Sequence, residues 1–126
     1  MKDVVLTDRG PKPIGPYSQA IKAGGFLFAS GQVAINPATN EFVPGDIRQQ
    51  TERALENVKG ILEAAGCHLH RVVKTTVFLK NMSDFAAMNE VYATYFVARP
   101  PARSVVQGPR IPAGTLVGLE AVAYLG

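Results

Sequence analysis

The stretch Pro100-Pro101-Ala102-Arg103-Ser104-Val105-Val106 decides how the rest of this sequence is interpreted. Proline is tolerated at the start of a strand but not inside a hydrogen-bonded ladder, so the proline pair predicts that a strand begins here. This boundary places Arg103 among the first residues of the strand. A guanidinium is always charged, and its planar fork of donors matches a carboxylate. Arg103 is therefore a candidate functional residue, although a lone arginine on a strand is more often a surface or paired residue.

A second charge stands out near the end of the chain. Glu120 is the only charged residue in the apolar run Leu116-Val117-Gly118-Leu119-Glu120-Ala121-Val122-Ala123-Tyr124. A carboxylate in such a run faces water, is paired, or takes part in chemistry. The run by itself leaves all three interpretations open.

Composition restricts the class of protein. The 126 residues are 47% hydrophobic and 18% charged, which is typical of one globular domain spanning residues 1–126. The 13 Lys and Arg residues are scattered, the net charge is only +3, and no basic run is interleaved with aromatics, so nucleic acid is not an expected partner. The single Cys67 excludes an internal disulfide. No apolar run reaches the ~18 residues that a membrane span needs, and we expect a cytoplasmic protein.

Hydrophobic periodicity and turn residues predict the order of elements. After a short edge strand and a rigid proline-rich segment, Gly24-Gly25 predicts a tight hairpin turn. Asp46 and Gln49 form a capping-box pattern at the start of an amphipathic helix, and Gly66 suits its C-terminal end. The predicted strands are 2–7, 18–23, 26–30, 72–79 and the two stretches that hold Arg103 and Glu120; the predicted helices start at Asp46 and at Asn81–Asp84; residues 36–40 and 108–114 are predicted turns or loops.

Side-chain patterns predict which faces are buried. In the strand 72–79, alternation groups Val73, Thr75, Val77 and Leu79 on one face. The second helix carries its apolar residues on one side, and the amide of Asn89 falls on that side, where it needs a polar partner. Amphipathic helices predict a sheet covered on one face only. Apolar residues on the other face suggest burial against another subunit.

The segment Cys67-His68-Leu69-His70 resembles a set of metal ligands, but the sequence does not favour a metal site. The chain contains no other Cys or His, so at most three soft ligands would be crowded into one loop. The same scarcity weakens any mechanism that needs a pair of histidines for acid–base chemistry. We therefore interpret these as loop residues.

Seven short motifs together resemble one known family, the reactive-intermediate deaminases, also called the Rid or YjgF family and in places described as L-PSP endoribonucleases. They cover nearly the whole chain and occur in the family's order. The motifs are Ile14-Gly15-Pro16-Tyr17-Ser18-Gln19-Ala20, Ser30-Gly31-Gln32, Ala64-Ala65-Gly66-Cys67, Val73-Lys74-Thr75-Thr76-Val77, Asp84-Phe85 with Asn89, Pro101-Ala102-Arg103-Ser104 and Leu119-Glu120-Ala121-Val122-Ala123.

The resemblance implies an α+β fold like that of chorismate mutase, with a mixed β-sheet, two helices on one face, and sheets that meet in a homotrimer with clefts between subunits. It also implies hydrolysis of 2-imino acids and their enamine tautomers, such as 2-iminobutanoate and 2-iminopropanoate, to 2-keto acids and ammonia. No cofactor and no metal are expected for this reaction.

The resemblance also assigns roles to residues. Arg103 matches the arginine that binds the substrate carboxylate, and Glu120 matches the acid proposed to position the attacking water. The side chains or backbone expected to line the cleft are Tyr17, Ser30, Gly31, Asn89 and Val105. Many relatives carry Cys where this chain has Val105, so a thiol is not essential here, although the substrate preference is open.

Two other functions compete with the deaminase. A ribonuclease or translation inhibitor would need a basic groove and a nucleophile or metal that this sequence lacks. A sensor or chaperone-like protein would bind small keto acids in the same carboxylate cleft without turnover. Glu120→Gln distinguishes these alternatives: if the protein is an enzyme, the substitution should abolish turnover but preserve keto-acid binding, whereas normal binding with no turnover by wild type would favour the sensor.

Overall fold

The computed structural model describes residues 2–108 and 114–126 of the chain. The elements of this part of the chain are β1 (Asp3–Val5), β2 (Ala20–Ala23), β3 (Phe26–Gln32), β4 (Ile35–Asn36), β5 (Glu41–Phe42), α1 (Ile47–Ala64), β6 (Val72–Leu79), α2 (Phe85–Tyr95), β7 (Ala102–Gln107) and β8 (Val117–Tyr124). Six strands form a sheet in the order β1-β2-β3-β8-β6-β7, and β4 and β5 form a separate hairpin. None of the described helices is both long enough and apolar enough to cross a bilayer.

The six-stranded sheet is mixed because one pair of neighbouring strands is parallel. β6 and β7 run in the same direction, whereas the other neighbours are antiparallel. Parallel neighbours need a crossover connection, and α2 supplies it between β6 and β7. The expected α+β architecture with a mixed sheet is therefore confirmed.

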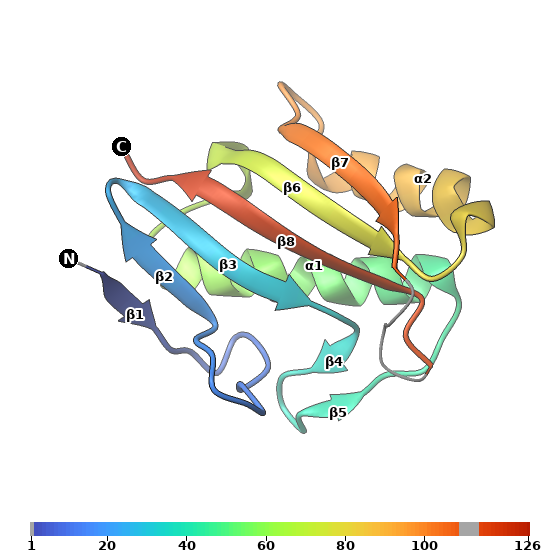
Figure 1. The fold of residues 1–126 in the computed structure, drawn as a ribbon, viewed down its shortest axis with the longest axis horizontal. Helices are drawn as coiled ribbons and strands as arrows, with labels where there is room; N and C mark the ends of the chain where they lie inside the picture. The colour runs from blue at the N-terminus through green and yellow to red at the C-terminus, as the bar shows by residue number, and fades with distance from the viewer. Residues whose placement is uncertain (1, 109–113) are drawn as a thin grey trace.

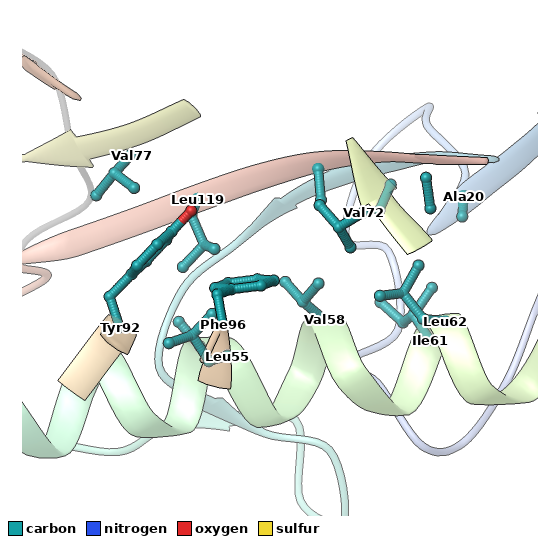
Figure 2. Close-up of a cluster of buried hydrophobic side chains, with 14 of the residues drawn as sticks. Ala20, Leu55, Val58, Ile61, Leu62, Val72, Val77, Tyr92, Phe96 and Leu119 are labelled. Carbon is teal, nitrogen blue, oxygen red and sulfur yellow. The ribbon is translucent and has the colours of Figure 1, made fainter. Parts of the chain in front are cut away.

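Both helices lie on the same side of the sheet (Figure 1). Apolar side chains of α1 and α2 meet the inward-facing residues of the strands and form the core shown in Figure 2. Labelled members of this core are Ala20, Leu55, Val58, Ile61, Leu62, Val72, Val77, Tyr92, Phe96 and Leu119. The prediction of a sheet covered on one face is confirmed.

The local signals at the first helix and the first hairpin are also confirmed. Asp46 accepts a hydrogen bond from the backbone N–H of Gln49, and the Gln49 side chain accepts one from the backbone N–H of Asp46. Gly66 follows the helix with φ 78°, a left-handed conformation that glycine adopts without strain. Gly24 and Gly25 have φ 59° and 81°, as a tight turn between β2 and β3 requires.

The prediction that Val73 shares a face with Thr75 is wrong. Val72 pairs with Ala123 and Lys74 with Val122, so the register between β6 and β8 shifts at this point. An extra residue in one strand reverses the alternation on one side of it. Val72 is consequently buried, while Val73 is 44% exposed on the other face.

Three smaller expectations have different outcomes. The loop predicted at 36–40 is confirmed as the turn of the β4–β5 hairpin, whose two-residue strands are too short to give a periodic signal. Asp84 precedes α2 but makes no side-chain cap, because a short 3-10 turn over Met82–Asp84 leads into the helix. The predicted turn at 108–114 falls largely on residues 109–113, which lie outside the described residues.

The face of the sheet opposite the helices carries large apolar side chains. Phe28 is 47% exposed, Tyr124 47% and Val106 41%. The rings of Phe26, Phe28 and Tyr124 lie close together, with centroids 5.5 Å apart for Phe26 and Tyr124. We call this surface the open face.

Candidate functional site

Arg103 lies on β7, at the edge of the sheet, and turns toward α2. It pairs across the parallel ladder with Thr75, which is fully buried on the helix-covered face. Residues directly opposite each other in neighbouring strands share a face, so Arg103 lies on the covered face. Its side chain is half-buried against α2. The strand predicted around Arg103 therefore holds its guanidinium against a helix.

The amide of Asn89 is the polar partner of this guanidinium. Arg103 Nη1 donates a hydrogen bond to Asn89 Oδ1, with a distance of 2.6 Å. Since a guanidinium only donates, the atom that faces it must be the amide oxygen. The prediction that Asn89 needs a polar partner is confirmed, and the partner is the other candidate residue of the same region.

Two aromatic rings of α2 also contact the guanidinium. Arg103 Cζ lies 4.8 Å from the ring centroid of Tyr92 and 5.6 Å from that of Phe85. A cation over an aromatic face is attracted by the quadrupole of the ring. Phe85 stood in a sequence motif without a predicted role and Tyr92 in none, because both occupy ordinary apolar positions of the second helix.

Arg103 has no acidic partner among residues 2–108 and 114–126. The ion pairs in this part of the chain are Arg9–Glu63 and Arg48–Glu90, both on the surface. Within the described residues, the Arg103 guanidinium donates a side-chain hydrogen bond to Asn89 alone, so its other N–H groups can donate to an anion. A bidentate carboxylate matches this fork best.

Glu120 lies in a different place, on the open face. It pairs with Thr76 of β6, which points away from the helices, and it borders a hollow of about 310 Å³ together with Phe28, Lys74 and Val122. Lys74 Nζ donates a hydrogen bond to Ser104 Oγ at 3.0 Å. Lys74 belongs to the motif Val73-Lys74-Thr75-Thr76-Val77, in which no role was predicted for it.

Strand register keeps Arg103 and Glu120 of one chain apart. In the ladders, Thr75 lies between Arg103 and Ala121, whereas the next residue, Thr76, lies between Ser104 and Glu120. Successive residues of a strand point to opposite faces of the sheet. One chain therefore places its candidate carboxylate-binding residue on the covered face and its candidate water-positioning residue on the open face.

Tyr17 and Gly31 form a third region. Both line a mainly apolar pocket of about 300 Å³ next to the β4–β5 hairpin, with Val33, Ile35 and Phe42 among its walls. Gly31 has open space where a Cβ would stand, so its backbone is accessible.

Buried amides hold the walls of this pocket in place. Asn57 of α1 donates to the carbonyl oxygens of Val33 and Ile35 at 3.1 and 2.8 Å. Gln19 donates to the carbonyl of Pro11 at 2.8 Å. Buried polar side chains that satisfy loop carbonyls fix irregular backbone that no ladder supports. The pocket is thus a preformed feature of the chain.

Ser30 and Val105 complete the predicted set. The Ser30 hydroxyl donates to the carbonyl oxygen of Ser18, so it is engaged within the chain. Val105 pairs with the buried Val77 on the covered face, two residues from Arg103, and packs against the core. A contact between either side chain and a substrate remains a prediction.

The segment that resembled a metal site follows α1 and leads into a short 3-10 helix over Leu69–Arg71. Cys67 is buried, and the rings of His68 and His70 stack with centroids 5.4 Å apart. Among the residues that the structure describes, no three His, Cys, Asp or Glu side chains are grouped so that they could hold a metal ion.

The fold and the sites define a class of protein: an α+β domain with a mixed six-stranded sheet that holds an arginine at its edge against a helix. Comparisons with known proteins identify the family. The family model described as Endoribonuclease L-PSP matches residues 7–125. The RutC family protein PH0854 of Pyrococcus horikoshii is 59% identical over 124 residues, which are 98% of each chain.

Two further relatives carry chemical information. The 2-iminobutanoate/2-iminopropanoate deaminase of Mus musculus is 43% identical over 126 residues, which cover 100% of this chain and 93% of the mouse protein. The crystal structure of E. coli TdcF with bound serine superposes with a TM-score of 0.91 at 41% identity, covering 97% of this chain and 98% of that one. The chain belongs to the Rid/YjgF/L-PSP family, as the sequence motifs predicted.

Proposed function

We propose that this chain, as a single domain spanning residues 1–126, hydrolyses 2-imino acids and their enamine tautomers, such as 2-iminobutanoate and 2-iminopropanoate, to 2-keto acids and ammonia. Membership of the family and the name of the mouse relative support this reaction. The serine bound to TdcF supports a small amino-acid-like ligand.

The observation that carries the proposal is the environment of the Arg103 guanidinium. Its guanidinium is held by Asn89, and no acidic side chain of the described residues neutralises it. A half-buried cation without a counterion in the chain is suited to an anionic ligand. A 2-imino acid offers a carboxylate directly beside the electrophilic carbon, so a clamp on the carboxylate also orients the reacting centre.

Glu120 is the proposed proton acceptor. Water attacks C2 of the protonated imine while Glu120 takes one of the water protons, which gives a carbinolamine. Glu120 then returns the proton to the nitrogen, the C–N bond breaks, and the carbinolamine oxygen becomes the keto oxygen. The hydroxyl proton leaves with the ammonia as ammonium. The sequence of steps needs no covalent nucleophile and no cofactor.

The positions of Arg103 and Glu120 require a second copy of the chain if both act on one substrate. We propose a homotrimer in which Arg103 and Asn89 of one subunit face Glu120, Tyr17 and Gly31 of a neighbour. The exposed rings of the open face support burial against another copy, because monomers rarely leave such patches in water. Closed rings of identical subunits bury one surface of each copy against a different surface of the next.

The rate of 2-iminobutanoate hydrolysis tests this function. The imine is generated in situ from threonine by a dehydratase, and wild type is compared with Arg103→Ala. Two charge-assisted hydrogen bonds of about 1.5–3 kcal/mol each predict that the variant loses at least about 100-fold in rate. The control is Arg48→Ala, which removes an arginine of a surface ion pair.

Several outcomes would contradict the proposal. If wild type does not exceed the spontaneous rate while the dehydratase is active, the chain is not a deaminase of this imine. Titration with 2-oxobutanoate would then test the binding-protein alternative. RNA cleavage that survives Arg103→Ala would favour the ribonuclease.

A further inference from the structure

We propose that Phe85, Asn89 and Tyr92 form a cradle on α2 that fixes the plane of the Arg103 guanidinium and thereby sets the preference of the site for carboxylates. Phe85 and Tyr92 act in this cradle as positioning residues, through Arg103 and not through contact with substrate. The inference rests on the proposed function and specifies how its carboxylate clamp is built.

The three residues are spaced to act together. Positions i, i+4 and i+7 of an α-helix lie on one face. Asn89 Oδ1 binds Arg103 Nη1 at 2.6 Å, while the Tyr92 and Phe85 ring centroids lie 4.8 and 5.6 Å from Arg103 Cζ. The guanidinium is thus held at one nitrogen and bordered by two rings, all supplied by a single rigid helix.

The Tyr92 ring is itself fixed by the sheet. Its hydroxyl oxygen lies 2.7 Å from Thr75 Oγ1, in a buried hydrogen bond, and the ring packs on Phe96 with centroids 4.7 Å apart. Figure 2 shows the Tyr92 side chain rising from α2 with its oxygen toward the sheet. Thr75 is the residue directly opposite Arg103 in the ladder. Tyr92 of α2 therefore contacts both Arg103 and Thr75, the residue that pairs with Arg103 in the sheet.

A guanidinium held in this way has lost most of its rotational freedom before any ligand arrives. Ordering a long side chain on binding costs affinity, and pre-ordering it removes that cost. The donors that remain lie in one plane, which suits two carboxylate oxygens and does not suit a neutral amide. Loosening the cradle should therefore weaken binding of carboxylates specifically, with little change in kcat, because Arg103 still binds the carboxylate in these variants and only the pre-ordering of its side chain is lost.

Calorimetric titration with 2-oxobutanoate and with its neutral amide, 2-oxobutanamide, tests the cradle. Tyr92→Leu and Phe85→Leu keep an apolar side chain but remove the aromatic face. We expect each to weaken 2-oxobutanoate binding by about tenfold, to leave amide binding unchanged, and to raise KM while kcat stays within about twofold. The control is Tyr95→Leu, which removes a ring of the same helix whose hydroxyl binds Glu56.

The results separate the cradle from a merely structural role. Equal weakening of both ligands, or wild-type discrimination in both variants, overturns the cradle. If Tyr92→Leu fails to fold, Phe85→Leu decides, because Phe85 is 36% exposed and its ring carries less of the core. If Arg103→Ala abolishes turnover while the cradle variants match wild type, the cradle falls and the proposed function stands. If wild type neither binds nor hydrolyses, both fall.

Discussion

The two faces of the six-stranded sheet differ in how complete they are. On the covered face, Arg103 is already surrounded by Asn89, Phe85 and Tyr92 of its own chain. On the open face, Glu120 is exposed beside Phe28 and Lys74 in a hollow of about 310 Å³. One chain therefore supplies several partners for the Arg103 guanidinium, whereas it leaves the Glu120 carboxylate exposed.

This difference shows how two residues predicted for one reaction can lie apart in one chain. Thr75 and Thr76 are neighbours in sequence. Thr75 pairs with Arg103 on the covered face, and Thr76 pairs with Glu120 on the open face. A two-residue periodicity makes such a separation unavoidable once the register is fixed.

Glu120→Gln tests the open face most severely. The amide keeps the shape of the side chain but cannot accept the proton of the attacking water, so kcat should fall by about 100-fold or more. Binding of 2-oxobutanoate should stay close to wild type, because the proposed clamp is Arg103. Imine hydrolysis and calorimetric titration of the same preparation check both parts. Wild-type turnover by Glu120→Gln would remove Glu120 from the mechanism.

Phe28→Asp tests whether the open face is covered by another copy. Burying an unpaired carboxylate in an apolar interface costs several kcal/mol of desolvation free energy, so the oligomer should dissociate. Activity should then fall together with assembly. Analytical ultracentrifugation and imine hydrolysis at matched concentrations measure the two quantities. The control is Val97→Asp, at an 80%-exposed position just after α2. A stable monomer with full activity would refute the shared site.

Val72→Ala and Val73→Ala compare the two faces at the irregularity of β6. Val72 is buried against the helices and Val73 is 44% exposed. Truncating the buried valine should lower the free energy of unfolding by about 2 kcal/mol, and truncating Val73 by less than about half of that. Urea unfolding of dilute protein measures both. Equal losses would mean that both side chains are buried, and therefore that the open face is covered under those conditions.

Tyr95→Phe should have the smallest effect and should appear only at alkaline pH. Burial, and then the hydrogen bond to Glu56, raise the pKa of the Tyr95 hydroxyl above its ordinary value. The protonated hydroxyl is thus favoured in the folded state, so its contribution to stability is complete below about pH 10 and is lost as the pH rises further. Between pH 8 and pH 11, the Tm of Tyr95→Phe should fall less steeply than the Tm of wild type. An unchanged slope would contradict this assignment.

Local signals predicted most of the fold. Gly24-Gly25, Asp46 with Gln49, and Gly66 each impose a backbone conformation through their own chemistry, and all three act as expected. The register between strands depends on partners distant in sequence, and the irregularity at Val72–Lys74 left no local mark. For that reason the face of Val73 was predicted wrongly.

The site was predictable as a set of residues but not as an arrangement. Arg103 and Asn89 were both candidates, but neither motif predicted the hydrogen bond between them. Phe85 and Tyr92 read as core residues, because an aromatic ring that packs in a core and one that borders a cation occupy the same helical positions. The opposite faces of Arg103 and Glu120 follow only from the paired ladders of β6, β7 and β8.

The most direct test of the shared site mixes two inactive variants. Arg103→Ala and Glu120→Gln are unfolded together, refolded in equal amounts, and assayed for imine hydrolysis beside each variant refolded alone. If each site takes its arginine from one subunit and its glutamate from another, random assembly restores about a quarter of the wild-type activity. If both residues act within one chain, every site keeps one defect, and the mixture stays as inactive as its components.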